Sequence, residues 1–230
     1  MDEDKEISIQ ILNEKFPAAL EYIKEIFLIH RDYGMVKNSV LAKRLAVSKP
    51  AVTQAMKRLN KYNLIEQDLY GSICLTSAGR LVAAKVLKRH YLIEHLLIRS
   101  LDYPWVKSDE EASRIQASLS DEFTEYLFEK MGRPETCPHG NPFPGSASEK
   151  EILSALRLNT VSFTGRSRIV RITEEGEAEA GLLQFCYENN LRPGRELEII
   201  SREEGVTVVT LGGASKIRIS DEYARYICID

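Results

Sequence analysis

Residues 39–61, SVLAKRLAVSKPAVTQAMKRLNK, carry two short amphipathic segments separated by a tight turn. Apolar residues recur at helical spacing in both segments: Leu41 and Leu45 in the first, and Val52, Met56 and Leu59 in the second. Ser48 can cap the second helix, and Pro50 suits its first turn, where no backbone N–H is needed. The polar face of the second segment is rich in Thr, Gln, Lys and Arg, so the pattern predicts a helix-turn-helix.

The next stretch, LIEQDLYGSICLTSAGR, predicts a wing of two strands joined by a turn at Tyr70-Gly71. From Lys37 to His90 there are eleven lysines and arginines and two acidic residues, so this segment carries +9 and the rest of the chain −12. Such a basic block fits a surface that meets phosphates, although a solvated charged face is an equal alternative on charge alone. Together, the helix-turn-helix, the wing and the charge favour DNA binding over a bare three-helix packing module.

In the rest of the chain the sequence pattern changes from helical spacing to short runs typical of β-strands. Helical spacing continues from Arg80 to Leu101 and through residues 108–132, where Phe123, Tyr126, Leu127 and Met131 form an apolar stripe. This stripe fits either the core or a contact with a second subunit. A loop rich in proline and glycine follows, and the runs RIVRI, ELEII, VTVVTL and KIRI then predict a small β-barrel with one helix at EAGLLQFCYENN.

These patterns predict a mainly α protein with a small β part, in three domains. A winged helix-turn-helix would occupy residues 1–80, a helical domain 81–150, to which the family resemblance given below assigns dimerisation and metal sensing, and a barrel 151–230. No stretch approaches the ~20 apolar residues of a membrane span. The acidic opening MDEDKEISIQ lacks the pattern of a secretory signal, and the four cysteines form no CxxC pair. We therefore expect a cytoplasmic protein with reduced thiols.

The segment HYLIEH, residues 90–95, contains two of the four histidines. Three interpretations are open: a metal site, a catalytic pair, or polar residues on the wet side of a helix. His90 and Glu94, four residues apart, share one helical face and could hold one ion, whereas His95 lies on another face and is interpreted as an ordinary surface residue.

The order of parts resembles the diphtheria toxin repressor family of iron- and manganese-dependent transcriptional regulators, in its long form with a C-terminal SH3-like domain related to ferrous-transport protein A. The matching stretches are EYIKEIF, LAVSKPAVTQAMKRLNKYNLI, LTSAGR, RHYLIEHLL, PWVKSDEEASRI, LSDEF, CPHGNPFPG and NNLRPGRELEII. The resemblance covers almost the whole chain after about residue 15. It implies that Cys137 and His139 shape a turn and are not a ligand pair.

The resemblance also implies a homodimer whose recognition helices enter successive major grooves of palindromic, double-stranded operator DNA. The positions that it places against bases are Ser48, Pro50, Ala51, Thr53 and Gln54. Those available for phosphates are Lys49, Lys57 and Arg58. This division agrees with chemistry, because Gln and Thr can read base edges while Lys and Arg supply salt-dependent affinity.

For metal sensing, the resemblance implies two ligand sets. The first maps to Glu21, Ser113, Gln116 and Ala117, where Glu21 is the one strong ligand, so we interpret this site as lost. The second maps to His90, Glu94 and Asp109, with Glu179 as a barrel contributor, and suits Mn²⁺ or Fe²⁺.

Three alternatives accompany this prediction. The same architecture could work without metal, because the first ligand set is degraded. A metalloenzyme is disfavoured, since HYLIEH lacks the HExxH order and the chain has neither a nucleophile elbow nor a glycine-rich phosphate loop. A scaffold whose barrel binds a protein partner is neither supported nor excluded by the sequence.

Overall fold

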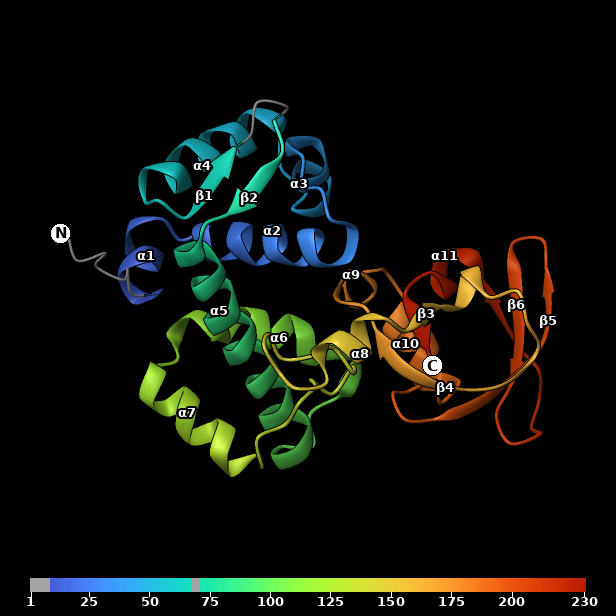
Figure 1. Cartoon of the computed structure of the whole chain (residues 1–230). Coiled ribbons are helices and arrows are strands. Elements are labelled where there is room, and N and C mark those ends of the chain that lie inside the picture. Colours follow the sequence, from blue (N-terminus) through green and yellow to red (C-terminus); the bar gives the residue numbers. More distant parts are fainter. Residues whose placement is uncertain (1–8, 68–70) are drawn as a thin grey trace. The chain divides into compact units, whose positions relative to one another are not determined.

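The computed structural model describes residues 9–67 and 71–230, which form two compact units. The first unit comprises the chain up to His90 together with Ser113–Thr124, and the second comprises Tyr91–Ala112 and Glu125–Asp230. Figure 1 labels their elements. The predicted domain boundaries at residues 80 and 150 remain a prediction. Among the described residues, no helix is both long and apolar enough to cross a membrane.

The first unit is a winged helix-turn-helix. Its elements are α1 (Ile9–Lys15), α2 (Ala19–Tyr33), α3 (Asn38–Arg44), α4 (Lys49–Lys61), β1 (Ile65–Gln67), β2 (Ile73–Leu75) and the start of α5 (Ser77–His95). Helix α2 ends before Gly34, whose positive φ of 78° lets its N–H return to the carbonyl of His30. The strands β1 and β2 pair antiparallel, which confirms the wing, although Tyr70 of the predicted turn lies outside the described residues.

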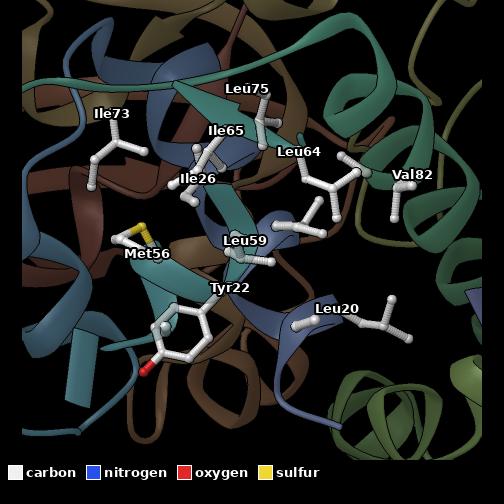
Figure 2. Packing of buried hydrophobic residues seen from close by; sticks show 14 of the residues in the cluster. Leu20, Tyr22, Ile26, Met56, Leu59, Leu64, Ile65, Ile73, Leu75 and Val82 are labelled. Carbon is white, nitrogen blue, oxygen red and sulfur yellow. The ribbon is translucent and has the colours of Figure 1, made fainter. Parts of the chain in front are cut away.

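The core of the first unit joins the helices to the wing. Figure 2 shows Ile26 of α2, Met56 and Leu59 of α4, and Ile65 and Ile73 of the wing gathered in one interior. All five side chains are at most 2% exposed. Because apolar residues of α4 face inward at helical spacing, its polar residues are directed outward.

The chain between α5 and the barrel is mainly helical, and the two units share it. The elements from α5 to the barrel are a π-helical turn (Leu96–Ser100), a 3₁₀ turn (Trp105–Lys107), α6 (Ser108–Ile115), a 3₁₀ turn (Gln116–Ser118), α7 (Asp121–Lys130) and α8 (Glu149–Leu153). Helix α6 and the 3₁₀ turn after it carry the chain from the second unit back into the first, and α7 carries it out again.

The barrel is a six-stranded antiparallel sheet in the order β3-β8-β4-β5-β6-β7. Its elements are β3 (Leu156–Arg157), a 3₁₀ turn (Leu158–Thr160), β4 (Gly165–Ile172), α9 (Glu174–Glu177), α10 (Leu182–Glu188), β5 (Glu196–Glu203), β6 (Val206–Thr210), β7 (Ile217–Ser220), α11 (Asp221–Ala224) and β8 (Ile227–Ile229). All four predicted strands and the predicted helix are present. Register shifts at Ile169/Arg171 and Ile199/Ser201 bend the strands, as barrel closure requires.

Gly79 provides a test of how α5 packs against the wing. A Cβ atom at this buried position would lie 2.0 Å from the backbone oxygen of Leu64. We therefore expect Gly79→Ala to lower the free energy of unfolding by roughly 1–3 kcal/mol, because a backbone atom cannot move aside easily. Urea denaturation would measure the change. The matched control is Ser77→Ala on the exposed side of the same turn, and equal stability of the two variants would contradict the packing.

Candidate metal centre and nucleic-acid interface

The recognition helix α4 begins as the sequence predicts. The Ser48 hydroxyl accepts the backbone N–H of Ala51 at 3.3 Å, which caps the helix, and Pro50 lies in the first turn. Thr53 donates its hydroxyl to the carbonyl of Lys49 at 3.1 Å. Seven of the eight predicted DNA-contacting residues are exposed, and Ala51 is half-buried. The start of α4 therefore presents a polar surface that a groove could receive.

The basic block is only partly available for phosphates. Arg58 donates to the carbonyl of Lys15 at 2.8 Å and lies 4.1 Å from the centroid of the Phe16 ring. Other members form ion pairs within the first unit: Arg44 with Glu25 at 2.8 Å, Arg89 with Asp121 at 2.7 Å and Lys85 with Asp121 at 3.3 Å. Part of the +9 charge thus stabilises the fold. Lys49 and Lys57 are better placed for phosphate contact, because both are exposed on α4.

The residues of the first ligand set lie close together, but the ammonium group of Lys24 lies among them. The side chain of Lys24 is 10% exposed, and its Nζ lies 3.0 Å from Glu21 Oε2 and 3.5 Å from Ser113 Oγ. Gln116 donates from Nε2 to Glu21 Oε1 at 2.7 Å, while Ala117 packs against the hydrophobic core. The one carboxylate of the set is therefore already paired with a cation. These residues do not fit a divalent ion.

The second ligand set converges on a buried cluster. Glu94 of α5, Asp109 of α6 and Glu177 of α9, all in the second unit, each place a carboxylate oxygen within 4.8 Å of the others. His90 precedes Glu94 by one turn of the same continuous helix, so α5 itself fixes their separation. Asp109 is half-buried and the other three residues are buried.

A loop after α7 brings Cys137 and His139, which the resemblance assigns to a turn, beside this cluster. The donor atoms of Cys137, His139 and Glu94 also lie within 4.8 Å of one another. His139 Nδ1 is 2.9 Å from Glu94 Oε1 and 3.4 Å from Glu177 Oε2. Its Nε2 is buried and has no hydrogen-bond partner among the described residues. A buried imidazole whose Nδ1 lies beside two buried carboxylates fits the donor set of a metal ion.

The loop also forms the turn that its sequence indicates. The N–H of His139 donates to Cys137 Sγ at 3.3 Å, and the N–H of Gly140 donates to the carbonyl of Cys137 at 2.9 Å. Gly140 has φ of 90°, and a Cβ there would lie 2.2 Å from the carbonyl oxygen of Val170. The Cys-x-His spacing therefore serves both the turn and the cluster. A Cys and a His two residues apart in a rigid loop was the available sequence signal.

The cluster concentrates negative charge in a desolvated place. Burial, followed by the negative charges of Glu94, Asp109 and Glu174, raises the pKa of Glu177 well above its usual range. Burial and the charges of Glu94 and Glu177 likewise raise the pKa of the Cys137 thiol. A divalent cation would compensate this charge.

Hydrogen bonds connect the cluster to the residues around it. Asn141 donates to Glu177 Oε1 and, at 2.7 Å, to the carbonyl of Ile172. The guanidinium of Arg171 donates to Asn141 Oδ1 at 3.2 Å. On the other side, the hydroxyl of Tyr91 donates to Glu174 Oε1. Such partners fix the orientation of ligand side chains.

Two predicted positions differ from the structure. Glu177, and not Glu179, reaches the cluster, because α9 is capped by Thr173 and its single turn directs Glu177 inward. Glu179 instead accepts the hydroxyl of Tyr226 at 3.4 Å. His95 is 2% exposed and not a surface residue, since its Nε2 pairs with the carbonyl of Thr136 at 2.7 Å. Burial lowers the pKa of His95. Like the prediction, the structure leaves His95 out of the cluster.

Comparisons with known proteins agree along the chain. Residues 17–73 match the family model "Iron dependent repressor, N-terminal DNA binding domain", and residues 76–145 match "Iron dependent repressor, metal binding and dimerisation domain". The chain is 23% identical to the iron-dependent repressor IdeR of Mycobacterium leprae, over 95% of this chain and 99% of that one. It is 27% identical to the diphtheria toxin repressor of Corynebacterium efficiens, over 91% and 93%.

Solved structures share this architecture as well. The crystal structure of T. acidophilum IdeR aligns with a TM-score of 0.73 and 28% identity, over 91% of this chain and 96% of that one. The SH3-like barrel is therefore part of the shared fold, as the sequence predicts.

The raised pKa of Glu177 predicts how stability depends on pH in metal-free protein. A carboxyl whose pKa is higher in the folded state stabilises the fold fully below its unfolded pKa, and this contribution is lost as pH rises toward the folded pKa. We expect Glu177→Gln to remove that loss, so the variant gains stability over wild type above about pH 4.3. Urea unfolding in chelator across pH would measure it, with Glu179→Gln as control. Parallel profiles for Glu177→Gln and wild type would contradict the buried charge.

Proposed function

Because the chain belongs to the iron-dependent repressor family of metal-dependent, DNA-binding transcriptional regulators, we propose that the buried cluster around Glu94 is the ion site through which it senses metal. The family consists of repressors and not enzymes, so no catalytic role is assigned to these residues. The alternative of a metal-independent regulator is not favoured, since a complete ligand cluster accompanies the degraded first set.

The observation that carries this proposal is the convergence of three carboxylates of the second unit, from α5, α6 and α9, within 4.8 Å, with His90 one turn before Glu94 on α5. One imidazole and three carboxylates form a hard ligand set, which suits Mn²⁺ or Fe²⁺. Cys137 and His139 extend the choice of ion, because sulfur and imidazole ligands favour softer ions. A solved relative is described as a manganese-dependent repressor in complex with manganese, and others as iron-dependent. An ion here would supply the positive charge that the buried carboxylates lack.

The proposed DNA partner is a palindromic duplex bound by a dimer. The model match over residues 76–145 is a dimerisation domain and includes α7. On α7, Phe123 is 45% exposed and Tyr126 is 56% exposed, while Leu127 is buried. We assign the contact with the second subunit to these two aromatic residues, which form the outer part of the predicted stripe. Two copies of α4 would then read two half-sites.

We expect metal to control DNA binding through this cluster. Metal-stripped full-length protein should bind Mn²⁺ or Fe²⁺ in calorimetry, and its affinity for a duplex selected from a random library should fall at least about 10-fold in chelator, which corresponds to 1.4 kcal/mol. Asp109→Asn should weaken ion binding, because it removes a charge from a half-buried position without opening a cavity. His30→Ala, at an exposed position of α2, is the control. Equal DNA affinity in chelator, or unchanged ion binding by Asp109→Asn, would reject the proposal.

The two kinds of contact on α4 should separate in binding assays. Gln54→Ala should reduce discrimination between the selected duplex and random DNA, because the amide can read a base edge. Lys57→Ala should weaken binding to both duplexes alike and reduce the salt slope by about one. Fluorescence anisotropy at several salt concentrations would measure both effects. If the two variants lost affinity equally on both duplexes, the assignment of Gln54 to base reading would be wrong.

A further inference from the structure

We infer that Gln116, Glu21 and Lys24 form a hydrogen-bond relay that fixes which ring nitrogen of His90 carries the hydrogen and which keeps the lone pair that can bind an ion. The inference rests on the ion site proposed above. It gives the degraded ligand set a present role, in which Gln116 is a positioning residue for the ligand His90. All of the relay residues belong to the first unit.

The relay begins at Lys24. Its ammonium lies 3.0 Å from Glu21 Oε2, so one oxygen of this carboxylate is held by a cation that is part of the chain. The other oxygen, Glu21 Oε1, lies 2.7 Å from Gln116 Nε2. Since the carboxylate of this ion pair accepts hydrogen bonds and does not donate them, the atom of Gln116 that faces it must be the amide nitrogen. The orientation of the amide is thereby determined by its chemistry.

The orientation of Gln116 determines the tautomer of His90. The amide oxygen, Gln116 Oε1, lies 3.1 Å from His90 Nδ1 within the buried interior. Because a carbonyl oxygen can only accept, His90 Nδ1 must carry the hydrogen and donate it. In a neutral imidazole the lone pair is then on Nε2, which is the form that binds a metal through that atom.

The degraded positions fit this role better than they fit a vacant metal site. Gln116 is 2% exposed, so its amide has no ready alternative partner in solvent. Lys24 supplies the positive charge that Glu21 needs, and its ammonium lies 3.5 Å from Ser113 Oγ. A neutral amide between a carboxylate and an imidazole can donate to one and accept from the other. A glutamate at position 116 would accept from both sides and so could not donate to Glu21.

The test is the tautomer of His90 in metal-free, full-length protein, measured by ¹⁵N NMR of labelled histidine rings. Wild type should show hydrogen on Nδ1. Gln116→Met, which has similar size but no amide, should lose this preference and bind Mn²⁺ about 10- to 100-fold more weakly, the usual effect of removing a partner behind a ligand. Ser113→Ala is the matched control, because it contacts Lys24 and should leave both readouts unchanged.

A second variant separates the loss of the hydrogen bond to His90 from a general disturbance of the fold. Gln116→Glu retains an oxygen that can accept from His90 and should keep the hydrogen on Nδ1, even if it alters the pairing with Glu21. Hydrogen on Nε2 in wild type, or an unchanged tautomer in Gln116→Met, would overturn the relay. If wild-type protein did not bind Mn²⁺, the ion site would be rejected. The tautomer of His90 is measured in metal-free protein, so it tests the relay independently of the ion site.

Discussion

The burial of several carboxylates at one place is the constraint on which the rest of this structure depends. Glu94 and Glu177 are almost fully enclosed, and Asp109 lies beside them. Like charges in a desolvated cluster destabilise the fold unless a cation or a proton compensates them. The surrounding residues provide hydrogen bonds to these carboxylates. Asn141 donates to Glu177 and accepts from Arg171, and His139 lies near both Glu94 and Glu177. The elevated pKa of Glu177 expresses the same cost in the absence of an ion.

Periodicity was sufficient to predict most of the fold. In α4, inward Met56 and Leu59 and outward Gln54 and Lys57 follow from helical spacing alone, because the segment is long and strongly amphipathic. The barrel strands were also predictable from their alternation and the glycines between them. Ser48 and Pro50 marked the start of the recognition helix in agreement with the observed cap.

The candidate site was less predictable, because it depends on contacts between distant segments. His90, Glu94 and Asp109 came from matching motifs, whereas the barrel contributor was misplaced by two residues. The sequence TEEGEAE offers four glutamates, and only the cap by Thr173 and the single turn of α9 select Glu177. Cys137 and His139 were assigned to a turn, and they do form one. Their proximity to Glu94 could not be predicted, because only the fold brings that residue beside them. His95 appeared exposed because its partner, the carbonyl of Thr136, is 41 residues away.

Lys24 has a consequence for what kind of signal the protein can report. Because the ammonium of Lys24 is part of the chain, its pairing with Glu21 does not itself depend on the concentration of an ion in solution. Under the function proposed above, the sensing of ion concentration falls to the cluster that contains Glu94. If that cluster is the one sensing site among the described residues, cooperativity in the metal response has to come from coupling between two copies of the chain. The steepness of DNA binding as a function of metal concentration would then be set by the dimer.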